Sequence, residues 1–376
     1  MHRLTAFYYN LKSDQFEQKT TEKKLGVNDV LIATTHSGLC FTDVHAKGKG
    51  CGLGHEGVGI VRDAGEAVTH LRIGDRVGWG WLNSVGDPAG LREAEMRGAT
   101  LKITYTYTAG RQSCGHCKTC VSGYRQYCSE ARGFAFSDLD QGAFSDYRII
   151  NSAFAYLIPE SIPSVDAGPL MCAGASVFEA LDAAGTRSDH RVGIVGLGGL
   201  GHTGVLFAKA MGCDVTVLSS STQKMKDSFE MGANEFRSFE RVNERFCKRD
   251  DEGLTTAEDP APMNIDVLLI TSNEVPSLET ILPCLARRAT IILMTIQQGN
   301  LSLPYMPFIL PGHKLIASTE ASRENHLRML DFVARHKIRP WTEEFPMTSD
   351  GVSKAFRRLE SGEMRYRGVL FRLDAV

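Results

Sequence analysis

Four cysteines lie close together in the segment SCGHCKTCVSGYRQYC, residues 113–128. In a reducing compartment such a cluster favours metal binding or chemistry over structural disulfides, and a CxxC pair by itself would suggest redox exchange. Four thiolates complete a tetrahedral zinc site with no open position, so we predict a structural zinc here. His116 offers another ligand, but we expect it to be exposed because four cysteines suffice. The predicted zinc ligands are Cys114, Cys117, Cys120 and Cys128.

A glycine-rich loop follows the apolar segment RVGIV and precedes the helix-like HTGVLFAKAMG. Its Gly196-x-Gly198-x-x-Gly201 spacing is weak alone but strong in this context. The first glycine allows a tight turn, the second lets backbone approach a pyrophosphate, and the third lets helix pack on strand. A plain structural turn is the alternative. The predicted dinucleotide-binding residues of the loop are Gly196, Leu197, Gly198, Gly199, Leu200 and Gly201.

The end of the next apolar segment, DVTVL, indicates which dinucleotide binds. NAD sites usually place a carboxylate there for the ribose 2′-hydroxyl, whereas this chain has Ser219, Ser220, Ser221 and Lys224. Asp214 stands at the start of the segment, too early for the ribose. Hydroxyls and an ammonium suit a 2′-phosphate, so we predict NADP(H); a solvated polar turn is the alternative.

The segments that position these residues indicate two kinds of structure. Residues up to about 160 contain short alternating stretches, typical of an irregular, mostly β domain. From about 165 to 300, unbroken apolar runs alternate with helix-like segments, which predicts a parallel sheet covered by helices. The remainder predicts a helix and then the strand RGVLFRL, which we expect to fold back onto the first domain.

Composition narrows the class of protein. The 376 residues have 43% hydrophobic and 23% charged residues and a net charge of −2, as in a soluble globular protein. No basic excess exists to attract nucleic acid or an anionic membrane. The N-terminus lacks the features of a signal or transit peptide, and no apolar run approaches a membrane span. We therefore expect a cytoplasmic protein.

Several motifs together resemble one family. GHEGVGIVRDAGEAVTHLRIGDRVGWG, the four cysteines, PLMCAG and GLGGLG follow in the order found in zinc-dependent medium-chain alcohol dehydrogenases. The chain is most similar to the NADP-dependent branch that includes cinnamyl alcohol dehydrogenases and fungal broad-range alcohol dehydrogenases. The resemblance implies an α/β fold, with a GroES-like, mostly-β catalytic domain over 1–160 that contains the lobe 113–128 and is completed by 301–376. A doubly wound Rossmann domain over 161–300 would bind NADP(H), with the active site between the domains. Relatives are usually homodimers that pair the edge strands of their cofactor sheets.

The resemblance also implies a second, catalytic zinc. Its protein ligands would be Cys40, His55 and Cys172, which spacing alone does not connect, and Glu56 matches a carboxylate that ligates transiently. Three protein ligands and one exchangeable position are typical of a catalytic zinc site.

Four further residues match family positions around this zinc. Asp43 would orient the ligand histidine. Thr42 would bond the substrate oxygen, and His45 would carry the proton outward. Ser176 would lie beside the nicotinamide.

The implied activity is hydride transfer between NADP(H) and a primary alcohol or aldehyde. Cellular NADPH is usually held reduced, so we expect aldehyde reduction to be favoured. A biosynthetic iminium or double-bond reductase of the same superfamily is one alternative. A non-catalytic zinc-containing binding protein is another, against which the neutral charge balance speaks.

Three departures from the commoner family pattern stand out, and one of them is a stretch between Cys40 and His55 that is shorter than in the animal enzymes and similar to the fungal branch. Phe41 stands where many relatives carry His or Arg to contact the cofactor pyrophosphate. Residues 81–112 contain about two dozen residues that relatives lack, well beyond a usual connection. This insertion is interpreted as a lid or dimer contact, as a tolerated surface loop, or as a gene-model artefact.

Overall fold

The computed structural model describes residues 1–82, 113–131, 133–238, 246–250, 253–257 and 263–373, with the backbone alone for 246–250 and 253–257. The insertion predicted over 81–112 therefore lies almost wholly outside the described residues. Two compact units are present. Unit 1 comprises Met1–Cys172, Ala321–Asp331 and Thr342–Val376, and unit 2 comprises Ala173–Glu320 and Phe332–Trp341. The sequence-based domain bounds at 160 and 300 stay a prediction.

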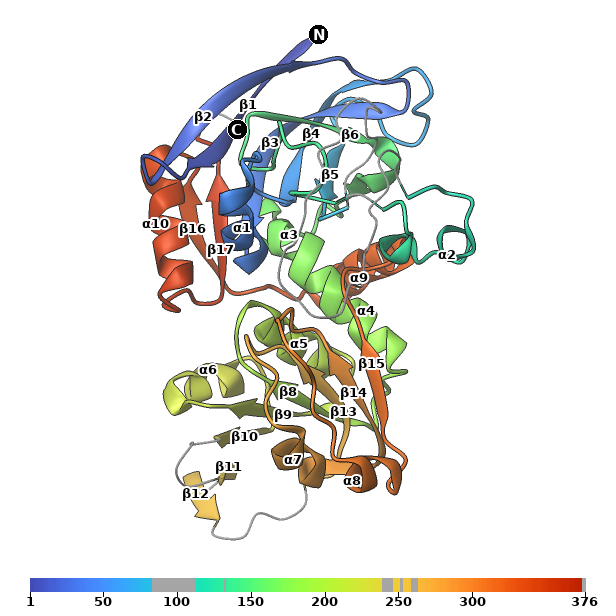
Figure 1. Cartoon of the computed structure of the whole chain (residues 1–376), viewed down its shortest axis with the longest axis vertical. Coiled ribbons are helices and arrows are strands. Elements are labelled where there is room, and N and C mark those ends of the chain that lie inside the picture. The colour runs from blue at the N-terminus through green and yellow to red at the C-terminus, as the bar shows by residue number, and fades with distance from the viewer. Residues whose placement is uncertain (83–112, 132, 239–245, 251–252, 258–262, 374–376) are drawn as a thin grey trace. The chain divides into compact units, whose positions relative to one another are not determined.

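Unit 1 is built on a seven-stranded sheet with the order β16-β17-β3-β4-β5-β7, in which β6 also pairs with β3 (Figure 1). Its central strand β3 is buried along most of its length. The C-terminal strand β17 pairs with β3 antiparallel, with Val369 opposite Gly38, which confirms that the chain end folds back onto the first domain. The strands of this sheet are β3 (Asp29–Leu39), β4 (Glu56–Ala64), β5 (Arg76–Trp79), β6 (Tyr147–Asn151), β7 (Tyr156–Leu157), β16 (Thr342–Pro346) and β17 (Arg367–Phe371). A separate two-stranded sheet pairs β1 (His2–Asn10) with β2 (Gln15–Lys23).

Short helices connect these strands, and one long amphipathic helix, α10, packs an apolar face into a core with Phe144, Phe356 and Leu370. The helices are α1 (Phe41–Ala46), η1 (Lys47–Lys49), α2 (Lys118–Val121), η2 (Arg125–Tyr127), η3 (Ser152–Phe154), α3 (Ser164–Pro169) and α10 (Ser349–Glu360). The π-helical turn η4 (Leu170–Gly174) and the helix α9 (Arg323–His336) begin in unit 1, and their last residues belong to unit 2.

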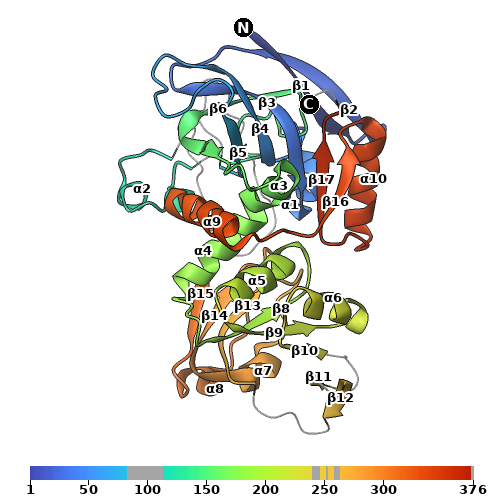
Figure 2. The same ribbon diagram turned by 180° about the vertical axis from the view of Figure 1, so that it is seen from behind.

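Unit 2 contains a six-stranded, fully parallel sheet with the order β10-β9-β8-β13-β14-β15. Counted from β8, this is the 3-2-1-4-5-6 order of a dinucleotide-binding sheet, which confirms the doubly wound prediction. Its central strands are buried because helices cover the sheet, as the views from front and back show (Figures 1 and 2). The strands are β8 (Arg191–Val195), β9 (Asp214–Ser219), β10 (Glu235–Ser238), β13 (Ile265–Ile270), β14 (Leu285–Leu293) and β15 (Lys314–Ala317).

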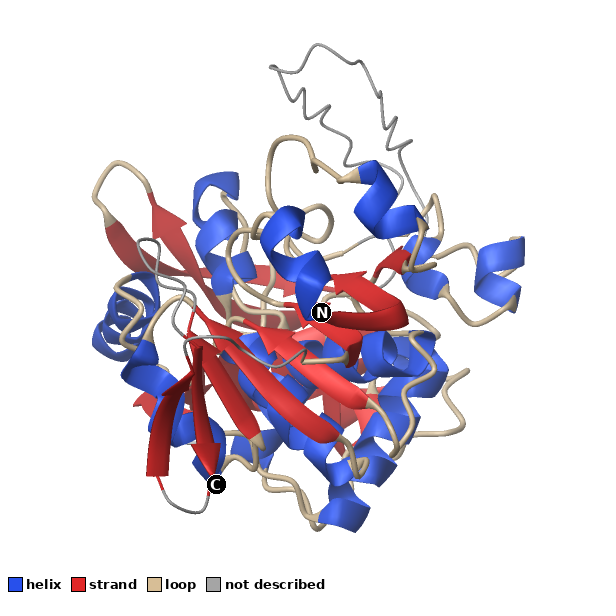
Figure 3. Cartoon of the chain, turned by 90° about the horizontal axis from the view of Figure 1, so that it is seen from below, coloured by secondary structure: helices blue, strands red, loops and turns tan. Residues whose placement is uncertain are grey.

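The helices of unit 2 follow its strands in the alternation expected from the sequence; Figure 3 separates helices from strands by colour. A hairpin of β11 (Phe246–Asp250) and β12 (Gly253–Ala257) follows β10, in a charged and polar segment for which we predict no strands from the sequence. The helices are α4 (Ala175–Ala183), α5 (Gly199–Ala210), η5 (Thr222–Lys224), α6 (Met225–Glu230), α7 (Leu278–Ile281), η6 (Leu282–Cys284) and α8 (Tyr305–Ile309).

Candidate functional site

Cys40 stands at the turn between β3 and α1 and begins the helix. Its backbone is extended, with φ −139°, and its N–H donates to the Asp43 carboxylate at 3.1 Å. In return, the Asp43 backbone N–H points to the Cys40 side chain, so the two residues cap the start of α1 reciprocally. The sequence thus places a thiol and a carboxylate side by side at one helix end.

Four metal-ligating side chains meet beside this turn: Cys40, His55, Glu56 and Cys172. One ligand atom from each lies within 4.8 Å of all the others. His55 immediately precedes β4, Glu56 is its first residue, and Cys172 lies in the π-helical turn η4, a conformation common at functional sites. His55 and Cys172 stand 117 positions apart in the sequence, and the fold brings their ligand atoms together as the family resemblance implied.

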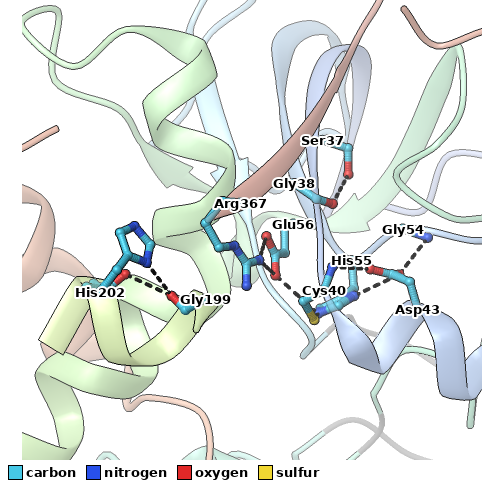
Figure 4. A network of polar contacts seen from close by, with 11 residues as sticks. Ser37, Gly38, Cys40, Asp43, Gly54, His55, Glu56, Gly199, His202 and Arg367 are labelled. Atoms are coloured by element: carbon cyan, nitrogen blue, oxygen red, sulfur yellow. Dashed lines mark hydrogen bonds and ion pairs between the residues drawn. The ribbon is translucent and has the colours of Figure 1, made fainter. Parts of the chain in front are cut away.

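The spacing of these donors fits zinc. His55 Nε2 lies 3.4 Å from Cys40 Sγ (Figure 4). A tetrahedral zinc with Zn–N of about 2.05 Å and Zn–S of about 2.3 Å would separate the two ligand atoms by about 3.5 Å. Two thiols, an imidazole and a carboxylate are also donors that zinc accepts.

Asp43 fixes the orientation of the His55 ring. His55 Nδ1 donates to Asp43 Oδ1 at 3.1 Å, and the Gly54 N–H donates to the same oxygen at 3.1 Å. Asp43 is 0% exposed and His55 2% exposed. With Nδ1 engaged, Nε2 is the nitrogen turned toward Cys40, as metal ligation requires.

Charges in the cluster attract a cation. The hydrogen bond from Cys172 holds the pKa of Cys40 well below its usual value, although burial opposes this, and the charges of His55 and Arg367 add to the effect. Burial lowers the pKa of His55, but the Asp43 and Cys40 charges outweigh it and hold this pKa well above its usual value. Without a metal, the His55 proton and Arg367 balance the negative groups of the cluster, and a divalent metal bound here would displace that proton.

Arg367 is a residue of this site that sequence reasoning missed. Its guanidinium, on β17, donates to both carboxylate oxygens of Glu56 (Figure 4). Burial raises the pKa of Glu56 to about 7, against the opposing charge of Arg367. The strand-like RGVLFRL indicated that β17 returns to the first domain, but no signal in the sequence pairs two residues 311 positions apart.

The four cysteines of residues 113–128 form a second cluster. Cys114 Sγ lies 3.9 Å from Cys120 Sγ and 3.8 Å from Cys128 Sγ, and Cys117 Sγ lies 3.9 Å from Cys128 Sγ. Zn–S bonds of about 2.3 Å in a tetrahedron place sulfurs about 3.8 Å apart, whereas a disulfide needs about 2.05 Å. The spacing fits one zinc and excludes disulfides among these four thiols.

Backbone N–H groups point at the sulfurs of this second cluster. The N–H of Cys117 donates to Cys114 Sγ at 3.2 Å, and the N–H of Cys120 donates to Cys117 Sγ at 3.4 Å. Hydrogen bonds of this kind stabilise thiolates, so backbone hydrogen bonding lowers the pKa of Cys117 to about 6. The backbone thus favours charged sulfur at Cys117, whereas burial raises the pKa of Cys120 to about 12 and also raises the pKa of Cys128.

In unit 2 the glycine-rich loop connects β8 to α5. Gly196 has φ +88°, a conformation that side chains disfavour, and a Cβ on Gly201 would lie 1.9 Å from the Gly196 carbonyl oxygen. A Cβ on Gly198 would meet no atom within 4 Å, so this backbone borders open space at the N-terminus of α5. These are the separate roles that a pyrophosphate-binding loop requires.

The serine-rich segment adjoins this loop. Ser219 ends β9, and the Ser221 N–H donates to Ser219 Oγ at 3.3 Å. Lys224 Nζ donates to the Leu197 carbonyl within the glycine loop at 3.0 Å. An ammonium and several hydroxyls therefore lie together at the carboxyl end of β9, next to the loop.

The other predicted residues fall on two helices. Thr42, half-buried, and His45, exposed, both lie on α1, while Ser176 is buried on α4. Phe41 is 40% exposed at the start of α1. Cys51, Cys213 and Cys284 are buried, as expected for small apolar side chains. Across the helices that the structure describes, none has the length and apolar character needed to cross a membrane.

Comparisons with known proteins agree with this geometry. Residues 26–103 match the alcohol dehydrogenase GroES-like domain, and residues 199–335 match the zinc-binding dehydrogenase domain. Cinnamyl alcohol dehydrogenase 8 of Arabidopsis thaliana is 30% identical over 93% of this chain and 89% of its own. NADP-dependent alcohol dehydrogenase C 1 of Mycolicibacterium smegmatis is 28% identical over 93% of this chain and 92% of its own. A cinnamyl alcohol dehydrogenase structure from Sorghum bicolor superimposes with a TM-score of 0.80 and 27% identity, covering 98% of both chains.

The chain belongs to the zinc-dependent medium-chain alcohol dehydrogenase family, in its cinnamyl alcohol dehydrogenase-like part. It is an oxidoreductase of the alcohol and aldehyde class. The GroES-like and Rossmann folds expected from the sequence are confirmed.

Proposed function

We propose that this enzyme transfers hydride between NADP(H) and primary alcohols or aldehydes, favours aldehyde reduction, and uses one catalytic and one structural zinc per chain. The observation that carries the proposal is that ligand atoms of Cys40, His55, Glu56 and Cys172 all lie within 4.8 Å of one another, with His55 and Glu56 buried and the two cysteines half-buried. Cys40, His55 and Cys172 would hold the catalytic zinc, and Glu56 is its carboxylate neighbour. When bound, zinc supplies Lewis-acid polarisation of the substrate oxygen.

The residues of α1 divide the proton handling between them. Thr42 follows the ligand Cys40 by two positions, so its hydroxyl can hydrogen-bond the substrate oxygen. His45 lies three positions further on, on the same face of the helix, and is exposed. Histidine is the side chain most often used for proton transfer, and exposure lets His45 exchange that proton with water. Asp43, between them, faces inward and keeps His55 oriented.

NADP(H) is favoured by the groups beside the glycine loop. Ser219, Ser220, Ser221 and Lys224 offer donors to a 2′-phosphate, and Lys224 already reaches the loop through Leu197. Ser176, on α4, is proposed to lie beside the nicotinamide, as in the family. Because cells hold NADPH reduced, reduction of the aldehyde is the proposed physiological direction.

A homodimer is proposed through unit 2. β15 is the last strand of the cofactor sheet and pairs with β14 alone among the described strands. The helix α8 just before it exposes Tyr305, Met306 and Ile309, and Leu310 follows at 67% exposure. An open strand edge beside exposed apolar side chains suits an isologous contact with a second copy. Light scattering of wild type and Leu310→Lys tests this proposal.

Metal analysis and turnover test the proposed reaction. We expect two zinc ions per chain in active protein, NADPH-dependent reduction of aliphatic or aromatic aldehydes, and loss of turnover in Cys40→Ser. An α,β-unsaturated aldehyde separates carbonyl from C=C reduction. One zinc per chain in well-folded protein, full turnover of Cys40→Ser, or reduction of the C=C bond alone would each contradict the proposal.

A further inference from the structure

A second metal-ligating group lies on the surface of the four-cysteine lobe. Ligand atoms of Cys114, His116 and Glu130 lie within 4.8 Å of one another, so Cys114 belongs both to this group and to the four-cysteine set. Sulfur, imidazole nitrogen and carboxylate oxygen are all donors that Zn²⁺ accepts. Three protein donors leave room for water, unlike the closed set of four thiolates.

The two groups differ in their access to solvent. Cys120 and Cys128 are only 8% and 6% exposed, so two ligands of the inner set face the interior of the lobe. His116 is exposed, and Cys114 and Glu130 are half-buried. His116 is the one exposed donor of the two groups, so a hydrated ion arriving from solvent meets it before the buried thiols of Cys120 and Cys128.

The geometry of His116 suits a ligand. Its Nδ1 lies 2.7 Å from the Cys114 carbonyl oxygen, which can only accept, so Nδ1 donates and Nε2 is the nitrogen left for a metal. Metal-ligating histidines commonly donate their other N–H to a backbone carbonyl in this way. Glu130 is tied to the same lobe, because its N–H donates to Cys128 Sγ at 3.4 Å.

We propose that Cys114, His116 and Glu130 form an outer zinc site through which the four-cysteine site is loaded and emptied. An incoming Zn²⁺ binds this set with water in its remaining positions. It then keeps Cys114 and exchanges His116, Glu130 and water for Cys117, Cys120 and Cys128. Any thiol proton on the four cysteines, including that of Cys114, passes to solvent when its sulfur binds zinc. Release follows the reverse order. The ion keeps its charge throughout, and no electrons move.

This inference rests on the proposed structural zinc and makes a kinetic prediction. Removing an outer ligand should slow loading and chelator-driven release of the inner zinc by the same factor, roughly tenfold, the lower end of the effect of losing a metal-site partner. The equilibrium zinc content should not change, because the inner ligands are intact. A merely structural role for His116 would lower zinc affinity instead.

The test uses holoenzyme and its His116→Ala and Glu130→Gln variants, with His336→Ala as a matched exposed-histidine control. Zinc release to a chelator and cadmium NMR during Cd²⁺ exchange follow the four-thiolate site separately from the mixed-ligand catalytic site. We also expect excess Cd²⁺ to give an additional mixed-ligand signal that both variants lose and the control keeps. Unchanged exchange rates in both variants, a fall in equilibrium zinc content, or an additional signal that survives both substitutions would each overturn the proposal.

Two further measurements keep the outcome interpretable. Thermal unfolding of each variant checks that the lobe remains folded, and Glu130→Gln stands in if His116→Ala does not fold. A holoenzyme without a four-thiolate metal would remove the structural zinc and this inference together. Aldehyde turnover with NADPH tests the proposed reaction separately.

Discussion

The carboxylate of Glu56 and the guanidinium of Arg367 form an ion pair in which both side chains are almost completely buried, although the residues stand 311 positions apart. Glu56 begins β4 and Arg367 begins β17, and β3 lies between these strands in the sheet. The pair therefore joins the metal-ligating cluster to the strand that ends the chain. It neutralises a carboxylate that would otherwise add negative charge to two thiols.

Arg367→Leu should destabilise the protein strongly. It leaves the Glu56 carboxylate buried without its partner, a change that costs roughly 3–5 kcal/mol of unfolding free energy. The double variant Glu56→Gln with Arg367→Leu should recover part of this loss, because no lone charge remains. Urea unfolding at neutral pH measures both, with exposed Arg335→Leu as control. Equal stability of Arg367→Leu and wild type would contradict the role of the pair.

Asp43→Asn should weaken zinc binding at the catalytic site while leaving the fold intact. The amide N–H₂ of the introduced asparagine can donate to His55 Nδ1, which then acts as an acceptor and carries no proton. The proton of the neutral ring then lies on Nε2, and this nitrogen is no longer free to bind zinc. We expect zinc affinity to fall by about 10–100-fold. Competition with a chelator measures this, and Asp350→Asn, on the exposed first turn of α10, should behave as wild type. Unchanged zinc retention would show that Asp43 does not orient the ligand.

The sequence predicted those parts of the site whose residues lie close together along the chain better than those whose residues lie far apart. The four lobe cysteines lie on adjoining turns, so their spacing sufficed to predict a tetrahedral set. The glycine loop and the serine-rich segment are local in the same way, because each lies directly after one strand and before one helix. Cys172 follows α3, which packs against β3 and β4, so its place beside Cys40 and His55 depends on tertiary contacts; only the family resemblance connected the three residues.

The residues that sequence reasoning missed depend on tertiary contacts. Arg367 meets Glu56 because β17 pairs with β3 in one register, and a shift of one residue would turn it to the other face. The hairpin β11–β12 arises in a charged, polar run whose composition resembles a solvated loop, so pairing between its strands overrides local preference. Neither feature leaves a periodic signal in the sequence.

Ser220→Asp should change the preference of the enzyme for its cofactor. A carboxylate at the exposed end of β9 would repel a 2′-phosphate and accept hydrogen bonds from the ribose hydroxyls of NADH. Two charges 4 Å apart repel by about 1–4 kcal/mol, depending on solvation, which corresponds to an increase of about fivefold to several hundredfold in KM for NADPH. Steady-state kinetics with both cofactors measure the ratio, with exposed Ser188→Asp as control. Equal use of NADPH and NADH by wild type would overturn the NADP(H) assignment itself.

Glu343→Gln should reduce stability at neutral pH but not in acid. Partial burial raises the pKa of Glu343, but hydrogen bonds from Arg358 at 2.7 and 3.2 Å and from the Arg365 N–H at 2.6 Å outweigh it, so its pKa is lowered. Because the pKa of Glu343 is lower in the folded than in the unfolded state, its ionised form stabilises the fold at any pH above the unfolded-state pKa of about 4.3. This contribution is lost as the pH falls through the folded-state pKa. The variant should therefore lose about 1 kcal/mol of unfolding free energy at pH 7, a value limited by solvent screening of this half-exposed pair. Denaturant unfolding over a pH series measures the difference. The exposed neighbour Glu344→Gln serves as control, and a difference that persists unchanged into acid would show that the Glu343 charge does not contribute.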